Sequence, residues 1–143
     1  ASIDLRFSGR YKYPILKDKP VHFGDKGLWS NVVETDNLVV ESGDFLLLDT
    51  LEYLKIPIDL CGILMLKSSS GRMGLEHHHA GWFDPGFHGT ATLEITNTAP
   101  WPIVIEKGQP IIQIALMKLT EHPDKSYRLT GRYMGQSFPT ESK

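Results

Sequence analysis

Short runs of alternating or continuous apolar residues recur along the whole chain, and they constrain its fold more than any other feature. These runs cover residues 2–7, 37–40, 45–50, 62–67, 90–97, 103–106 and 111–117. The stretches between them are rich in glycine, proline, asparagine and aspartate, the residues typical of turns. Helical spacing is almost absent, although residues 51–58 leave room for one helical turn that Pro57 would limit. The pattern predicts an all-β sandwich or closed barrel.

The length of the chain limits the number of domains that it can form. With 143 residues, we expect residues 1–143 to be one domain. Residues 17–31 have the irregular composition of a surface loop. From residue 121 the sequence turns polar, and we expect residues 121–143 to be a flexible tail. Such a tail either folds over a ligand or frays as a terminus, and composition leaves both alternatives open.

The charge balance excludes large polyanions as partners. Lys and Arg number 15 against 17 Asp and Glu, so the chain has no basic excess for binding nucleic acid. A small anionic ligand needs only a few local cations and stays compatible with this balance. No apolar run reaches the ~20 residues that a membrane span needs. We therefore expect neither nucleic acid nor a membrane as a partner.

The cysteine count excludes several zinc sites. Cys61 is the only cysteine, so the chain has no intrachain disulfide, and we expect a reducing, cytoplasmic location. Zinc nucleoside deaminases need at least two thiolates around the metal, which this chain cannot supply. A histidine site is the remaining alternative. In a strand His77 and His79 would share one face, with Glu76 or Asp84 completing the ligands; ordinary packing histidines are the other interpretation.

Two polar segments are candidate ligand sites. Residues 67–72, K-S-S-S-G-R, follow an apolar run, and their hydroxyls and cations can wrap a phosphate in a glycine-flanked turn. Residues 80–89, A-G-W-F-D-P-G-F-H-G, combine small residues that let a ligand approach the backbone with aromatic faces for a base. An ordinary polar turn at the first segment, and a turn capped by Asp84 at the second, are the structural alternatives.

A third candidate is the carboxylate of Glu94. In residues 91–95, Leu93 and Ile95 share one face of a strand, while Thr92 and Glu94 share the other. If that second face is buried, Glu94 lies in a pocket. The pattern alone favours the other alternative, in which Glu94 is a solvated strand residue.

Several motifs, in this order, resemble those of the dCTP deaminase family, which shares a superfamily with trimeric dUTPase. They cover nearly the whole chain. The motifs are S-x-D-L-R in residues 1–6, T-x-E-x-x-x-x-P in residues 50–57, [KR]-S-S-x-[GA]-R-x-G-L in residues 67–75, A-G-x-[IF]-D-P-G-[FW]-x-G in residues 80–89, T-L-E in residues 92–94 and [GK]-[KR]-Y-Q-G-Q in residues 131–136.

The resemblance implies a distorted β jelly roll or barrel of the dUTPase type, assembled as a homotrimer with active sites between subunits. It implies hydrolytic deamination of dCTP to dUTP without zinc. Mg2+ is expected on the phosphates of the nucleotide rather than on protein side chains. Whether the reaction continues to dUMP stays open.

The resemblance also assigns roles to residues of this sequence. Glu94 is carried over as the general acid/base that activates water, and Ser68 and Arg72 as the groups that hold and polarise the reacting site. Ala80 is carried over as a backbone contact to the base. The remaining candidates for binding the substrate are Lys67, Ser69, Asp84, Phe87, Gln113, Tyr133 and Gln136.

The sequence departs from the family pattern at four points. The segment that precedes S-x-D-L-R in the family is not in this sequence, so the chain could be a piece of a longer one. Ser70 stands where an apolar residue or alanine is usual, and Met134 replaces a glutamine. His79 replaces a common threonine, which leaves feedback control by dTTP open.

Two alternatives to a pure deaminase remain. One is a dUTPase, or a bifunctional enzyme, in which Asp84 activates water against the α-phosphate beside Mg2+. The other is a nucleotide-binding regulator without catalysis. Glu94 distinguishes a deaminase from a pure dUTPase, because a pure dUTPase does not need a carboxylate at this position of the sequence.

Overall fold

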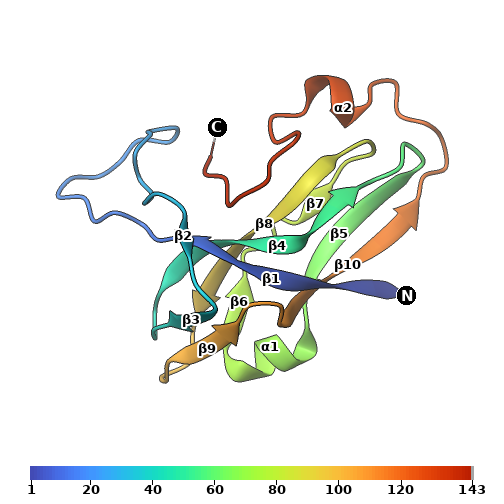
Figure 1. Cartoon of the computed structure of the whole chain (residues 1–143). Coiled ribbons are helices and arrows are strands. Elements are labelled where there is room, and N and C mark those ends of the chain that lie inside the picture. Colours follow the sequence, from blue (N-terminus) through green and yellow to red (C-terminus); the bar gives the residue numbers. More distant parts are fainter. Residues whose placement is uncertain (143) are drawn as a thin grey trace.

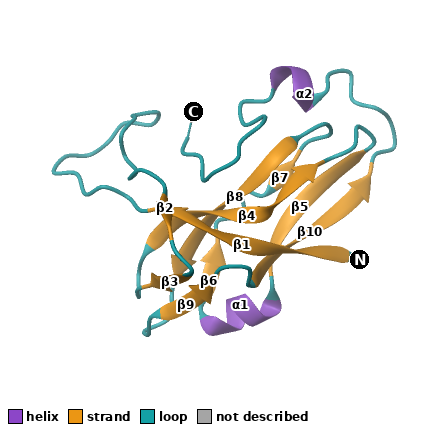
Figure 2. Ribbon diagram, viewed as in Figure 1, coloured by secondary structure: helices purple, strands orange, loops and turns teal. Residues whose placement is uncertain are grey.

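The computed structural model describes residues 1–142, in which strands make up most of the regular structure (Figures 1 and 2). The elements are β1 (Ser2–Lys12), β2 (Val33–Glu34), β3 (Asn37–Val40), β4 (Phe45–Lys55), β5 (Leu60–Leu66), α1 (Ser68–Met73), β6 (Leu75–His77), β7 (Trp82–Phe83), β8 (His88–Asn97), β9 (Ile103–Glu106), β10 (Pro110–Lys118) and α2 (Tyr127–Thr130). The prediction of an all-β fold is confirmed.

One curled sheet forms most of the body. Its strands run in the order β6-β8-β4-β1-β10-β5-β7, β2 pairs with β1 beside this path, and β3 and β9 form a small second sheet. The pairs are antiparallel. The curl lets side chains from distant strands meet in one core, which includes the fully buried Phe7, Leu48, Leu93, Ile105 and Ile112. This is the distorted jelly-roll type of fold that the family resemblance implies.

The expected helical turn in residues 51–58 is wrong, because β4 continues as a strand to Lys55. Its second half pairs with β8, where Tyr53 lies opposite Thr90 and Leu54 opposite Gly89. This long-range pairing satisfies the backbone groups that a local turn would have used, so tertiary pairing decides the conformation. Pro57 lies beyond the end of the strand.

Residues 68–73 form a helix rather than the predicted phosphate-wrapping turn. In α1 the N–H of Gly71 donates to Lys67 O (3.0 Å), and the helix ends at Gly74, which has the left-handed φ of 103° that favours glycine. The helical bonding uses backbone N–H groups that the turn would have offered to a phosphate. The N–H of Gly71 is therefore used within the helix, whereas the first-turn N–H groups of residues 68–70 have no acceptor inside α1 and can contact a ligand together with the exposed side chains.

Ser70 anchors α1 to the body. Its side chain is buried and its hydroxyl donates to Ile111 O at the start of β10 (2.9 Å). The hydrogen bond explains how a hydroxyl is accommodated where the family usually has an apolar residue.

A buried carboxylate joins β4 to β1. Asp49 accepts a hydrogen bond from the Ser8 hydroxyl, and Arg10 Nη2 lies 2.6 Å from Asp49 Oδ2. Burial raises the pKa of Asp49 above its ordinary value, and the hydrogen bond from Ser8 and the charge of Arg10 oppose that rise.

Two irregular segments flank the sheet. The loop between β1 and β2 extends away from the body as a surface loop, as predicted, and the C-terminal segment returns past α2 toward the same side (Figure 1). Within residues 1–142, neither helix has the length and apolar character needed to cross a membrane.

Candidate active site

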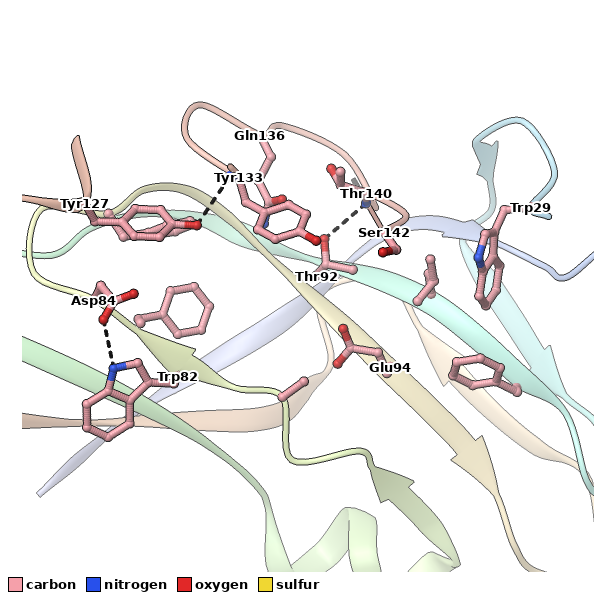
Figure 3. Close-up of a pocket in the computed structure, with 15 residues that line it drawn as sticks. Trp29, Trp82, Asp84, Thr92, Glu94, Tyr127, Tyr133, Gln136, Thr140 and Ser142 are labelled. Atoms are coloured by element: carbon pink, nitrogen blue, oxygen red, sulfur yellow. Dashed lines mark hydrogen bonds between the residues drawn. The ribbon is translucent and has the colours of Figure 1, made fainter. Parts of the chain in front are cut away.

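A pocket of about 450 Å³ lies where β8, the segment after β6 and the C-terminal segment meet. Six of the predicted site residues line it, and we call them the pocket group: Ala80, Asp84, Phe87, Glu94, Tyr133 and Gln136. Figure 3 shows the Glu94 carboxylate projecting from β8 into the cavity, with Asp84 on one side and Trp29 on the other. Members of the pocket group up to 56 positions apart in the sequence thus share one cavity.

Glu94 is half-buried in this pocket, so the solvated alternative that the pattern favoured is wrong. Its side chain is 26% exposed, and Oε2 is buried without a hydrogen-bond partner among residues 1–142. The alternation along β8 was read correctly, since Leu93 and Ile95 are fully buried in the core. The second face of β8 is covered because the C-terminal segment crosses it, and alternation along one strand carries no information about that crossing.

The C-terminal segment is held against β8 by a main-chain bond and a side-chain bond between the same two residues. The N–H of Thr90 donates to Gln136 O (2.9 Å), and Gln136 Nε2 donates to Thr90 O (2.6 Å). Further along, the N–H of Thr140 donates to the Thr92 hydroxyl (3.1 Å). Gln136 Oε1 is left buried in the pocket without a partner among the described residues. The segment roofs the pocket, while its flexibility stays a prediction.

The segment from Ala80 to Phe87 forms one wall. The indole Nε1 of Trp82 donates to Asp84 Oδ1 (3.0 Å), so this interaction orients the carboxylate beside the cavity. Phe87 is buried and packs edge-on against Phe83, with ring centroids 4.7 Å apart. Phe87 therefore serves mainly as packing beneath the wall, with its edge on the cavity.

The three consecutive histidines have separate environments rather than alternating along a strand. β6 ends at His77, which is buried; His78 stacks on Phe45 (4.8 Å) and bonds to the Thr96 hydroxyl (2.8 Å). His79 has a left-handed φ of 56°. Because the strand stops at His77, the expected shared face of His77 and His79 is wrong. Residues 1–142 contain no group of three or more His, Cys, Asp or Glu side chains placed to hold a metal ion.

The other five predicted site residues lie outside this pocket. We call them the helix group: Lys67, Ser68, Ser69, Arg72 and Gln113. Lys67 forms an ion pair with Asp4 of β1, and Asp4 lies directly opposite Gln113 of β10. In Figure 1, α1 is at the bottom of the molecule, whereas the C-terminal segment and α2 are at the top. One subunit does not bring the two groups together.

Sequence reasoning missed several residues that line the pocket. Trp29 comes from the loop between β1 and β2 and meets Phe45 edge-on at 5.1 Å. Tyr127, at the start of α2, donates its N–H to Pro85 O (3.1 Å) and so joins the roof to the wall. Thr140 and Ser142 complete the roof. A lone aromatic in an irregular segment has no periodicity that would reveal its position.

Solved structures show which class this fold belongs to. The 2′-deoxycytidine 5′-triphosphate deaminase of Agrobacterium tumefaciens superposes with a TM-score of 0.67 at 23% identity, covering 83% of this chain and 39% of that one. The native EIAV dUTPase gives a TM-score of 0.55 at 18% identity, covering 87% and 92%. Together with the pocket, these likenesses define a dUTPase-like jelly-roll domain with a carboxylate in its cavity.

Sequence comparison narrows that class to a family. The dCTP deaminase-like family matches residues 1–119, and the chain belongs to it. The chain is 46% identical over 109 residues to the "dCTP deaminase, dUMP-forming" of Mycobacterium avium, covering 73% of this chain and 57% of that protein. It is 45% identical over 114 residues to the Rhodococcus opacus protein of the same name, covering 77% and 60%. The chain thus spans less than two thirds of the length of these relatives.

Proposed function

We propose that this chain deaminates dCTP by hydrolysis, releasing ammonia and dUTP. The observation that carries the proposal is Glu94, a carboxylate in a cavity with aromatic walls, in a chain of the dCTP deaminase-like family. The cavity contains the group that proton transfer requires and leaves it only partly exposed. The names of the relatives add support.

In the proposed reaction Glu94 handles the protons. Water attacks C4 of cytosine, and Glu94 accepts a proton from that water and returns it to N3 or to the leaving amine. The new C–O bond replaces the C–N bond, so dCTP and water give dUTP and ammonia. Charge develops at the tetrahedral centre, and donors already in position stabilise it. Ser68 and Arg72 are the donors proposed for that role, with the Ala80 backbone holding the base.

These donors must come from another copy of the chain, because the helix group lies outside the pocket of its own subunit. Ser68, Ser69 and Arg72 are exposed on α1 and are free to face a neighbour's pocket. In a closed threefold ring, every subunit offers its pocket group to one neighbour and its helix group to the other. We therefore propose a homotrimer with three active sites between subunits.

An apolar surface on the sheet supports this assembly. Ile63 of β5 lies opposite Trp82 of β7, and Met65 lies opposite Gln113 of β10, so these side chains project from the same face. Ile63, Met65 and Trp82 are 36%, 43% and 56% exposed. Contiguous apolar side chains on a surface are typical of subunit contacts. This face runs from the pocket, which Trp82 lines, to the helix group, which includes Gln113.

We propose that Mg2+ binds together with the nucleotide. A triphosphate binds Mg2+ through its own oxygens, and Mg2+ retains water readily, so few protein ligands are needed. The ion would neutralise phosphate charge while the protein orients the base.

Conversion onward to dUMP is a second candidate activity. Asp84 lies in the same cavity with one oxygen accepting from Trp82, and the curated relatives are named dUMP-forming. In this bifunctional alternative Asp84 activates a second water against the α-phosphate and pyrophosphate leaves.

The cytoplasmic location expected from the single cysteine stays a prediction.

Product analysis tests these proposals together. The chain is incubated with dCTP and Mg2+, and dUTP, dUMP, ammonia and pyrophosphate are separated. Ammonia equal to the sum of dUTP and dUMP supports deamination, and the ratio of the two nucleotides reports the second activity. Cleavage of dUTP without deamination of dCTP would leave a dUTPase, and binding without any product would leave a regulator. Excess EDTA is expected to abolish turnover.

A further inference from the structure

His77, the last residue of β6, is a buried polar side chain that the reaction described so far does not use. It is 2% exposed, and neither Nδ1 nor Nε2 has a hydrogen-bond partner among residues 1–142. Buried imidazoles nearly always bond through at least one ring nitrogen, because leaving both unpaired is costly. Packing alone therefore does not account for a histidine at this position.

The nearest group of opposite character is Glu94. His77 Nε2 lies 3.5 Å from Glu94 Oε2, which is itself buried and without a partner among the described residues. This distance is only slightly longer than the 2.7–3.2 Å of an N–H···O bond, and hydrogen bonds in active sites often shorten when substrate binds. Two buried polar atoms without a hydrogen-bond partner among the described residues thus face each other at this contact.

The two residues lie on neighbouring strands that pair in the sheet. His77 lies opposite Ile95 in the β6–β8 ladder, and the N–H of His78 donates to Glu94 O (3.2 Å). Opposite residues of an antiparallel pair share a face, so the ladder places His77 with Ile95, and its ring reaches the Glu94 carboxylate at the end of β6. Both residues belong to the sheet, and neither belongs to the C-terminal segment.

Gly81 provides the space for the imidazole. A Cβ at this position would lie 3.2 Å from His77 Cε1 and 2.6 Å from Leu64 Cβ. Because glycine has no side chain, the main chain of the pocket wall passes directly against the ring. The wall closes His77 from solvent without displacing it from Glu94.

We propose that His77 is a positioning residue for Glu94. The Nε2–H group of His77 donates to Oε2, which leaves Oε1 to accept the proton of the attacking water. This bond stabilises the ionised carboxylate, the form that can take a proton, and restricts it to one orientation in the cavity. The role in turnover rests on the proposed deaminase function, whereas the His77–Glu94 contact does not.

A matched set of variants tests the role in turnover. His77→Gln places an amide nitrogen near the position of Nε2, whereas the shorter His77→Asn places it near Nδ1, out of reach of Glu94. We expect His77→Asn and His77→Met to lose roughly 10²-fold in kcat for dCTP with little change in KM, as for a misplaced catalytic group. We expect His77→Gln to retain most of the activity. Thermal unfolding of each variant controls for loss of structure.

Two outcomes of these assays would overturn the inference. In one, His77→Asn and His77→Met turn over dCTP at the wild-type rate. In the other, His77→Gln loses as much activity as His77→Asn while remaining folded, which would mean that an Nε2 donor is not what matters.

A spectroscopic readout separates this inference from the proposed function. The six histidines are labelled with 15N, and the His77 ring signals are identified by their loss in His77→Gln. We expect a bonded Nε2–H in the wild-type chain, and a change in its ring shifts in Glu94→Gln. If the His77 ring shifts are the same in the wild-type chain and in Glu94→Gln, the inference is wrong whatever the activity. If they differ but dCTP is not deaminated, the proposed function fails and the contact remains.

Discussion

The pocket group and the helix group differ in their exposure to solvent, because the fold gathers one around a cavity and leaves the other on the surface. The pocket group converges on one cavity, where Glu94 and Gln136 each have a buried oxygen without a partner among the described residues. The helix group lies on the outside, with Ser68, Ser69 and Arg72 exposed on α1. In the proposed trimer, the chain therefore contributes one half of a site as an interior and the other half as a surface. Such a division is what a site shared between copies requires.

The two regions are also held in different ways. The pocket is closed by long-range contacts, in which the C-terminal segment pairs with β8 and α2 bonds to the wall. The helix α1 is a local element of six residues, anchored by the buried hydroxyl of Ser70. Changes in the pocket should consequently affect chemistry most strongly, whereas changes on α1 should act on the neighbour's chemistry or on local stability.

The largest effect is expected for Glu94→Gln. The amide keeps the shape of the side chain but cannot accept the proton of water, so deamination should fall by ~10²–10⁴-fold. Nucleotide binding should change little, because the residues proposed to contact the phosphates are other ones. Steady-state assays and dCTP titration measure both quantities, and Glu76→Gln, at an exposed position on the neighbouring strand, is the control. Deamination at the wild-type rate would refute the assignment of the base.

The second prediction concerns Asp84→Asn and the products. If the chain also cleaves the triphosphate, this change should lower pyrophosphate release by roughly 10²-fold while dUTP accumulates from dCTP. Deamination itself should fall only modestly, because the amide oxygen still accepts from Trp82. Chromatography of nucleotides from dCTP and from dUTP gives both rates. An equal loss of both activities would show that Asp84 supports the cavity rather than a second reaction.

The third prediction concerns trimers assembled from two variants, one changed in the pocket group and the other in the helix group. Glu94→Gln and Arg72→Ala should each be nearly inactive alone, but trimers containing both kinds of subunit should regain about a third of the wild-type rate, since one of their three sites draws both intact residues from different copies. Co-expression with two affinity tags yields the mixed trimers, and each variant purified alone is the control. No recovery would contradict a site shared between subunits. Light scattering that reports a monomer would contradict it independently.

The smallest effect is expected for Ser70→Ala. This change removes the hydrogen bond to Ile111 O in α1 but leaves a residue that the family commonly has there, so the loss in the free energy of unfolding should be about 1 kcal/mol. Activity should stay close to wild type, since the exposed residues of α1 are unchanged. Denaturant unfolding measures the first quantity. A large loss of activity at unchanged stability would place Ser70 in the site itself.

Much of the fold could be predicted from local pattern. The boundaries of β3 and β9 match the predicted runs, and β8 and β10 each extend theirs by only two residues, because alternation and turn residues act over a few positions. Prediction failed where distant pairing decides conformation. β4 continues past Thr50 because β8 pairs with it, and α1 forms where only a polar turn was expected.

For the candidate site too, the sequence predicted one part and only the tertiary structure decided the other. Motif resemblance indicated which residues to examine, including Glu94 and Gln136, because side-chain type and spacing are properties of the sequence itself. Only the tertiary structure decided that Glu94 lies in a cavity, that Trp29 and Tyr127 border it, and that His77 rests beside the carboxylate. The reason is physical: burial and contact arise from strand pairing and from a segment crossing β8 over 40 positions away. No local pattern encodes which surfaces such a crossing will cover.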